Sequence, residues 1–234
     1  NGGGPGVIGV IDYYQDPPSN YREALLPGQI CHAPIPFTLN VVPHRLRVDY
    51  HDPAKPHNST YTLQRTDLSS FKPSDDPSLR FLGLSSDEFL LSIGCKLRHV
   101  VLISDPLTEP ARHIAGYSGF IVAPLYTLHD AAGNYKPHIT YEIVLRAQAY
   151  QLSNVFYLPS SDPHGIRECF ARFDRMQFVR VEHLFPKPVR LTEKGTDILR
   201  QWSWNFLGLS VVLDPALEEF RRKAAEELTK RLGS

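Results

Sequence analysis

The chain has 234 residues, 42% hydrophobic and 21% charged, a balance that predicts a folded soluble protein with one large domain. Its 25 basic and 25 acidic residues cancel, so bulk charge excludes a strongly basic nucleic-acid binder, and any such role must rest on a local patch. No run approaches the roughly 18 apolar residues of a membrane helix. The 3 cysteines are far apart and the 10 histidines lack ligand spacing. The sequence therefore predicts a cytoplasmic protein with no metal, no cofactor and no membrane contact.

The first part of the chain predicts a flexible end followed by a strand and a hairpin. Residues 1–20 begin with a Gly-rich stretch without Met, which indicates a flexible segment or a tag scar. A Pro27-Gly28 turn opens a strand over residues 29–34. Residues 45–50 alternate, and together with 61–63 they predict a hairpin with a Pro-rich tip. Residues 66–78 are polar loop, and a short apolar turn over 89–93, capped by 85–88, is expected to be helical.

The middle of the chain predicts a series of short strands. Residues 100–103 are an uninterrupted apolar run closed by Ser104-Asp105-Pro106, which is typical of a buried strand. A second apolar strand is expected over residues 119–125. Shorter strands are expected at 139–145, 155–158, 169–173 and 178–181. This spacing predicts a small, strongly curved antiparallel sheet or barrel.

Two helices are expected to close the chain. One begins near Thr192 and runs through Phe206, and it holds Trp202 and Trp204 at a spacing that cannot share a face, so at least one of them is core or interface. The other starts with the Asp214 cap before a proline and ends near residue 232. Its apolar stripe packs on the body or on a partner: Leu217, Phe220, Ala224, Leu228 and Leu232. The fold class is therefore mainly β with C-terminal helices.

Two basic clusters are candidates for binding an anion. Lys96-Leu97-Arg98-His99 precedes the buried apolar run, either as the solvated end of that strand or as a charged lip that presents donors to an anionic ligand. A second cluster alternates with phenylalanines: Arg172, Arg175 and Arg180 with Phe170, Phe173 and Phe178. Basic and aromatic residues on one groove would suit single-stranded RNA, whereas ordinary alternation would place Phe inward and Arg outward.

The order of these segments resembles the PemK/MazF-like family, the toxins of bacterial toxin–antitoxin pairs. The segments that carry the resemblance are Pro-Gly-Gln-Ile at 27–30, Lys-Leu-Arg-His-Val-Val-Leu-Ile-Ser at 96–104, Phe-Ile-Val-Ala-Pro-Leu-Tyr-Thr at 120–127 and Leu-Thr-Glu at 191–193. The resemblance implies an SH3-like curved antiparallel barrel over residues 21–208. A long insertion, residues 37–94, separates its first two core strands, and residues 209–234 add a C-terminal helix.

The resemblance also implies a function and a site. It implies a homodimeric endoribonuclease toxin that cleaves single-stranded RNA without a metal and is neutralised by a small antitoxin. The family's catalytic arginine falls on Arg98, and its catalytic hydroxyl falls on Tyr126 or Thr127. The implied substrate-binding residues are Lys96, His99, Arg172 and Arg175. An arginine and a hydroxyl at adjacent strand ends can hold a phosphate and stabilise the charge that develops on it.

Three departures from the family pattern keep a second function open. His99 stands where the family has proline, as an acid–base group or as an ordinary strand residue. Tyr126 lies closest to the family's Thr or Ser, and Thr127 can serve only if the strand has already ended, because adjacent strand residues face opposite sides. The long 37–94 segment is the third departure. The alternative is a catalytically degraded barrel that binds nucleic acid or protein in a bacterial defence or regulatory complex.

Overall fold

The computed structural model describes residues 12–36, 44–50, 52, 54–55, 58, 60–66, 91–108, 118–209 and 215–232. The chain forms two compact units, one of residues 1–33 with 97–234 and the other of residues 34–96. Residues 1–11, the expected loop over 67–78, the expected cap over 85–88 and Asp214 lie outside the described residues.

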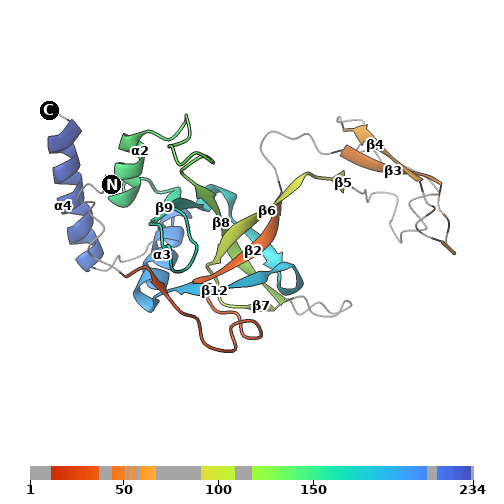
Figure 1. Ribbon diagram of the computed structural model, residues 1–234, viewed down its shortest axis with the longest axis horizontal. Helices are drawn as coiled ribbons and strands as arrows, with labels where there is room; N and C mark the ends of the chain where they lie inside the picture. Colours follow the sequence, from red (N-terminus) through yellow and green to blue (C-terminus); the bar gives the residue numbers. More distant parts are fainter. Residues whose placement is uncertain are drawn as a thin grey trace. The chain divides into compact units, whose positions relative to one another are not determined.

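The first unit is built on a strongly curled, mainly antiparallel sheet (Figure 1). Within the described residues its order is β1-β12-β2-β6-β8-β10-β9, with β7 and β11 also paired to β8. The strands are β1 (Tyr14–Gln15), β2 (Gln29–Pro36), β6 (Cys95–Leu102), β7 (Leu107–Thr108), β8 (Ser118–Thr127), β9 (Val155–Leu158), β10 (Cys169–Arg172), β11 (Gln177–Arg180) and β12 (Phe185–Leu191). The prediction of a curved antiparallel sheet is confirmed, and the sheet has the form of a half-barrel.

The apolar runs form the centre of this sheet. Val100, Val101 and Leu102 are fully buried and pair antiparallel with Pro124, Ala123 and Val122 of β8. Both faces of these strands are covered, which is why their sequences are continuous apolar runs rather than alternating ones. The core that contains Val101 and Ala123 also includes Trp202 of helix α3 (Glu193–Phe206).

One expected strand is a helix. The prediction of a strand over 139–145 is wrong, because α2 (Tyr141–Gln148) occupies this stretch. The Thr140 side chain accepts a hydrogen bond from the backbone N–H of Ile143, and Glu142 pairs with Arg146 one turn later. A capped start and an i,i+4 ion pair favour a helix over the apparent alternation.

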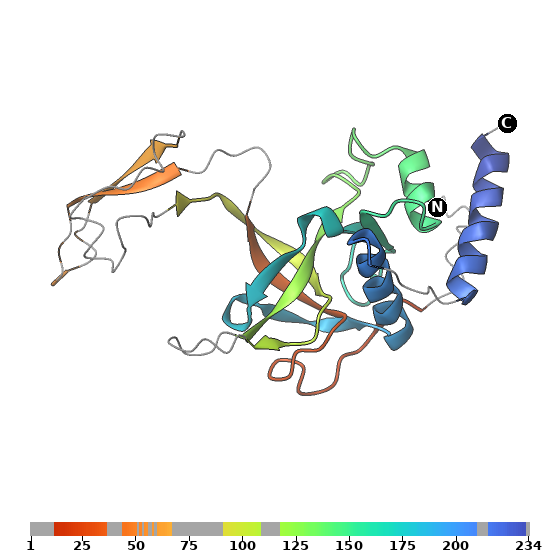
Figure 2. The same ribbon diagram turned by 180° about the vertical axis from the view of Figure 1, so that it is seen from behind.

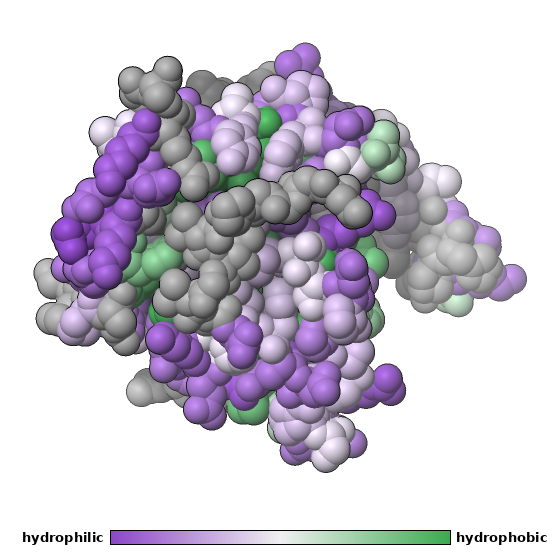
Figure 3. Space-filling model, turned by 60° about the vertical axis from the view of Figure 1, so that its left-hand side comes forward, coloured by the Kyte–Doolittle hydropathy of each residue, from purple (hydrophilic) through white to green (hydrophobic). Residues whose placement is uncertain are grey.

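The last helix, α4 (Pro215–Leu232), packs beside α2 (Figures 1 and 2). Leu217 is buried, and Phe220 packs against Leu145 and Ala149, so this part of the predicted apolar stripe lies on the body of the unit. The side chains of Ala224, Leu228 and Leu232 lie outside the described residues. In Figure 3 most of the coloured residues are hydrophilic or intermediate, and apolar ones show only as small separate areas.

The N-terminal segment is partly anchored, in contrast to the flexible end expected for residues 1–20. Tyr14 pairs with Leu191 of β12, and its hydroxyl donates to the carbonyl of Pro159 at 2.7 Å. The hydroxyls of Tyr13 and Tyr150 lie 3.2 Å apart. The two tyrosine rings bury apolar surface, which offsets the entropy lost on fixing residues 13–15.

The second unit contains a small antiparallel sheet of order β4-β3-β5, with β3 (His44–Tyr50), β4 (Thr60–Arg65) and β5 (Leu91–Ser92). The predicted hairpin is confirmed, since β3 and β4 pair along their length. The prediction of a helical turn over 89–93 is wrong at Leu91 and Ser92, because these two residues form a strand that pairs with β3. Among the described helices none is long and apolar enough to cross a membrane.

Gly28 allows three strands to meet at the start of β2. Its N–H donates to Leu102, its carbonyl accepts from Leu191, and its φ is +80°. A Cβ here would lie 2.2 Å from Thr196 Oγ1, whereas Gly133, with φ +87°, has nothing within 4 Å. We expect Gly28→Ala to lower the free energy of unfolding by about 2–4 kcal/mol and Gly133→Ala by about 1 kcal/mol, since only the former adds overpacking to backbone strain.

Urea denaturation of the two alanine variants measures this difference. Because both glycines have a left-handed backbone, Gly133→Ala is a matched control for the strain alone. Equal losses of stability in the two variants would contradict the packing role assigned to Gly28.

Candidate functional site

The structure brings Arg98 and Tyr126 together. The β6–β8 register pairs Val100 with Pro124, and continuing it places Arg98 opposite Tyr126. The Arg98 Cζ lies 4.4 Å from the centroid of the Tyr126 ring, and both residues are partly exposed. A guanidinium at this distance over a phenol ring is a cation–π contact. The two residues that the resemblance assigns to the catalytic arginine and hydroxyl are therefore cross-strand neighbours.

Arg172 reaches the same ring from β10. Its Cζ lies 5.5 Å from the Tyr126 centroid, and Phe170 of β10 pairs with Tyr126. The Arg172 Nε donates to Asp174 Oδ1 at 2.7 Å, and its Nη2 donates to the other carboxylate oxygen. This bidentate pair lowers the pKa of Asp174, chiefly through the hydrogen bonds from Arg172.

Arg175 lies beside Asp174 as Arg172 does, but it is not among the arginines that contact the Tyr126 ring. Its Nε lies 3.6 Å from Asp174 Oδ2, so one carboxylate serves both arginines. Arg180 pairs with Glu182 instead. Phe170 and Phe173 are buried, whereas Phe178 is 45% exposed. The burial in β10 does not alternate, since Cys169, Phe170 and Ala171 are all buried. We call the set Arg98, Tyr126, Arg172, Asp174 and Arg175 the arginine–tyrosine cluster.

Thr127 does not join the cluster. It is the last residue of β8 and still pairs with Cys169 of β10, so its side chain points to the face opposite Tyr126. Its hydroxyl accepts from Lys136 Nζ at 3.0 Å, and the same ammonium donates to the Thr127 carbonyl. Of the two candidate hydroxyls, the structure brings only that of Tyr126 to Arg98.

His99 also lies apart from the cluster. His99 stacks on His32 with ring centroids 4.2 Å apart, and its Nε2 lies 3.1 Å from Lys187 Nζ. Burial, followed by the charges of His32 and Lys187, lowers the pKa of His99 to about 4. Because it adjoins Arg98 on a strand, it faces the other side of the sheet. Lys96 is exposed and belongs to the second unit.

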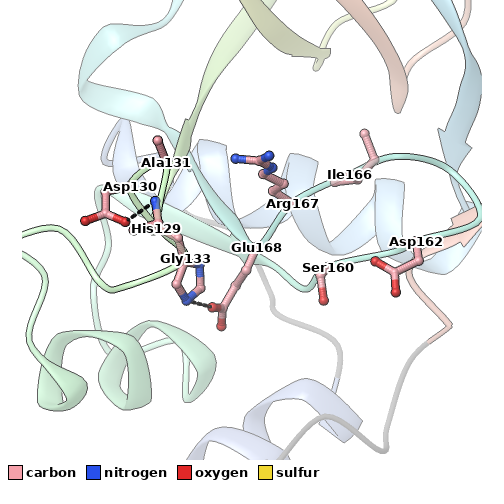
Figure 4. Close-up of a pocket in the computed structure, with 10 residues that line it drawn as sticks. His129, Asp130, Ala131, Gly133, Ser160, Asp162, Ile166, Arg167 and Glu168 are labelled. Atoms are coloured by element: carbon pink, nitrogen blue, oxygen red, sulfur yellow. Dashed lines mark hydrogen bonds and ion pairs between the residues drawn. The ribbon is translucent and has the colours of Figure 1, made fainter. Parts of the chain in front are cut away.

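The loops after β8 and before β10 form a pocket that the sequence did not predict (Figure 4). Its volume is about 390 Å³, and two of the side chains that line it, His129 and Glu168, point toward each other with Nε2 and Oε2 3.5 Å apart. Glu168 also accepts hydrogen bonds from Tyr157 at 2.6 Å and Tyr135 at 3.4 Å. Asp130 accepts from two backbone N–H groups of its own turn. No motif joins these residues, so sequence alone could not have grouped them.

No protein-family model matches the chain, and neither a curated protein nor a solved structure matches it. Within the described part of the chain, no group of three or more His, Cys, Asp or Glu side chains is placed to hold a metal ion. The cluster and the resemblance in sequence are therefore the two observations that bear on function.

Proposed function

We propose that the protein binds single-stranded RNA on the arginine–tyrosine cluster and cleaves it without a metal ion, as an endoribonuclease of the toxin type. The observation that carries the proposal is the 4.4 Å contact between the Arg98 guanidinium and the Tyr126 ring. It supports a site in which a fixed positive charge and a phenol hydroxyl lie on neighbouring strands and remain open to solvent.

The groups of the cluster suit a backbone phosphate. An arginine offers several N–H donors in a planar fork, and two of them can grip two oxygens of one phosphate. The partly exposed Tyr126 ring offers a surface on which a base can stack. Asp174 holds Arg172 in place, so a second positive charge lies beside the ring at a fixed position.

The chemistry requires only proton transfer and charge stabilisation. The RNA 2′-oxygen bonds to phosphorus, the bond from phosphorus to the 5′-oxygen breaks, and a 2′,3′-cyclic phosphate remains. The 2′-hydroxyl loses a proton and the departing 5′-oxygen gains one. The Tyr126 phenol both donates and accepts, so it can exchange these protons, while Arg98 stabilises the negative charge on the phosphorane.

A binding module is the second candidate, and one observation favours it. The hydroxyl of Thr127 and the imidazole of His99 both lie away from Arg98, so two groups that could have assisted proton transfer are not beside it. A cluster with arginines and one tyrosine is sufficient to bind RNA without cutting it. A homodimer and a small antitoxin stay predictions from the resemblance.

Two Tyr126 variants separate these functions. Tyr126→Phe retains the ring but removes the hydroxyl, so we expect RNA affinity within about twofold of wild type and cleavage about a hundredfold slower, as for loss of an acid–base group. Tyr126→Ala also removes the stacking surface and should weaken binding about tenfold. Tyr141→Phe, at a tyrosine 61% exposed on α2, is the matched control.

The assay uses a labelled single-stranded RNA in EDTA, with fluorescence anisotropy for binding and gel analysis for 2′,3′-cyclic phosphate ends. The same strand made of DNA should bind but stay intact, because it lacks the 2′-hydroxyl. RNA binding without cleavage by the wild type would support the binding module, and an absence of both would reject the two candidates.

A further inference from the structure

Three basic side chains meet on the face of the sheet away from Arg98. They come from the neighbouring strands β12, β2 and β6, which supply Lys187, His32 and His99. The two imidazole rings stack at 4.2 Å with an angle of 20°, and the Lys187 ammonium donates to His99 Nε2 at 3.1 Å. All three residues are partly exposed, so a ligand can reach them.

Among the described residues, the charged groups that shift the pKa values of the two histidines are basic. Burial and then the charge of Lys187 lower the pKa of His32. Burial and then the charges of His32 and Lys187 lower the pKa of His99. On β8, the register places the apolar Leu125 opposite His99, and on β12 Arg190 is bound to the carbonyl of Pro27. None of the ion pairs found within the described residues includes any of the three side chains. Three groups that can each carry positive charge therefore converge, and no described carboxylate forms an ion pair with them.

We propose that His32, His99 and Lys187 form a binding site for a tetrahedral oxyanion, the phosphate group of single-stranded RNA or of a free nucleotide. Three separate donors on three strands match an anion with oxygens in several directions, whereas a planar carboxylate is matched best by the fork of an arginine. The Lys187 ammonium has three N–H donors, and its contact with His99 uses one.

Anion binding at this site should be coupled to proton uptake. In the free protein, burial and the neighbouring charges keep the pKa of His32 below its usual value and that of His99 at about 4, so both rings are neutral at pH 7. A bound anion stabilises the charged ring and raises these pKa values. Affinity should therefore rise as pH falls from the pKa of the complex towards that of the free protein, by up to about tenfold per pH unit for each proton taken up.

Sulfate is a suitable probe, because its charge is constant between pH 4.5 and 8. We expect saturable sulfate binding, followed by the ring C–H signals of His32 and His99 in NMR spectra at constant ionic strength set with chloride. The dissociation constant should fall about fivefold or more between pH 7.5 and 5.5. A pH-independent constant, or no saturable binding at pH 5.5, would overturn the proposal.

Variants locate the binding. Lys187→Gln should weaken sulfate binding about tenfold and, as an independent sign of the contact, raise the pKa of His99 in the NMR titration. His99→Gln should weaken binding and flatten the pH dependence. The matched controls His138→Gln and Lys194→Gln change exposed residues and should leave binding unchanged. Equal binding by all four variants would show an adventitious ion only and reject the site.

Two competitors distinguish the sources of the phosphate. Single-stranded RNA that displaces sulfate would assign the site to a nucleic-acid backbone, and displacement by uridine 5′-monophosphate alone would assign it to a small molecule. The site does not depend on the proposed cleavage, so Arg98→Ala should bind sulfate as the wild type does. Failure of both competitors to displace sulfate would reject a phosphate ligand.

Discussion

Replacing Arg98 by alanine is expected to slow RNA cleavage by about a hundredfold or more. Its guanidinium lies closer to the Tyr126 ring than that of Arg172, and loss of one such electrostatic contact in the transition state typically has this effect. Arg98→Lys should recover little activity, because a single ammonium cannot bind two phosphate oxygens in one plane. The measurement is the single-turnover rate of cleavage of a labelled RNA in EDTA.

The control for Arg98→Ala is Arg146→Ala. Arg146 is exposed on α2 and pairs with Glu142, so its loss removes an equal charge far along the chain from the cluster. Both variants should unfold within about 1 kcal/mol of wild type, as expected for partly exposed charged residues. Full cleavage by Arg98→Ala would end the catalytic assignment, and equal losses in both variants would indicate a general effect of charge.

The largest expected effect on stability is that of Trp202→Ala, a loss of about 3–5 kcal/mol in the free energy of unfolding. Trp202 is 1% exposed, and its Nε1 donates to the carbonyls of Leu152 and Val155 at 3.2 Å each. Its ring contacts that of Tyr150, and the Arg221 guanidinium lies 4.7 Å from its centroid. The alanine variant leaves a large cavity and two carbonyls without their donor.

Trp204→Ala is the matched control in the same helix. Trp204 is 38% exposed, so its replacement should change the free energy of unfolding by about 1 kcal/mol or less. Circular dichroism during denaturation measures both variants without relying on tryptophan fluorescence. A loss as small for Trp202→Ala as for Trp204→Ala would mean that α3 contributes little to the core.

The sequence alone predicted elements whose local signals agree with their surroundings. The apolar run at Val100–Ile103 is buried, the hairpin of β3 and β4 forms, and Thr192 caps α3 through a hydrogen bond from the Gly195 N–H. In these stretches the hydrophobic pattern or the capping residue specifies the local structure without information from neighbouring elements.

Local signals failed where a neighbouring strand decided the structure. The strand β12 contains Pro186 and Pro188, and prolines argue against a strand because each lacks an N–H donor. It nevertheless pairs with β2, since the register shifts between Pro186 and Arg190, so that Pro188 lies within the irregularity and Pro186 at its edge. The alternation of 139–145 wrongly predicted a strand, because the capped helix start at Thr140 outweighed it and the stretch forms α2.

For the candidate site, the sequence determined which side chains were available, and the tertiary structure decided which of them meet. Arg98 and Tyr126 could be singled out from the order of the segments, but the choice of Tyr126 over Thr127 depends on β8 continuing through residue 127. His32, His99 and Lys187 share no motif and meet only because β12, β2 and β6 are adjacent. The physical reason is that side-chain direction in a strand reverses at every residue, so a contact across strands depends on register, which no single segment encodes.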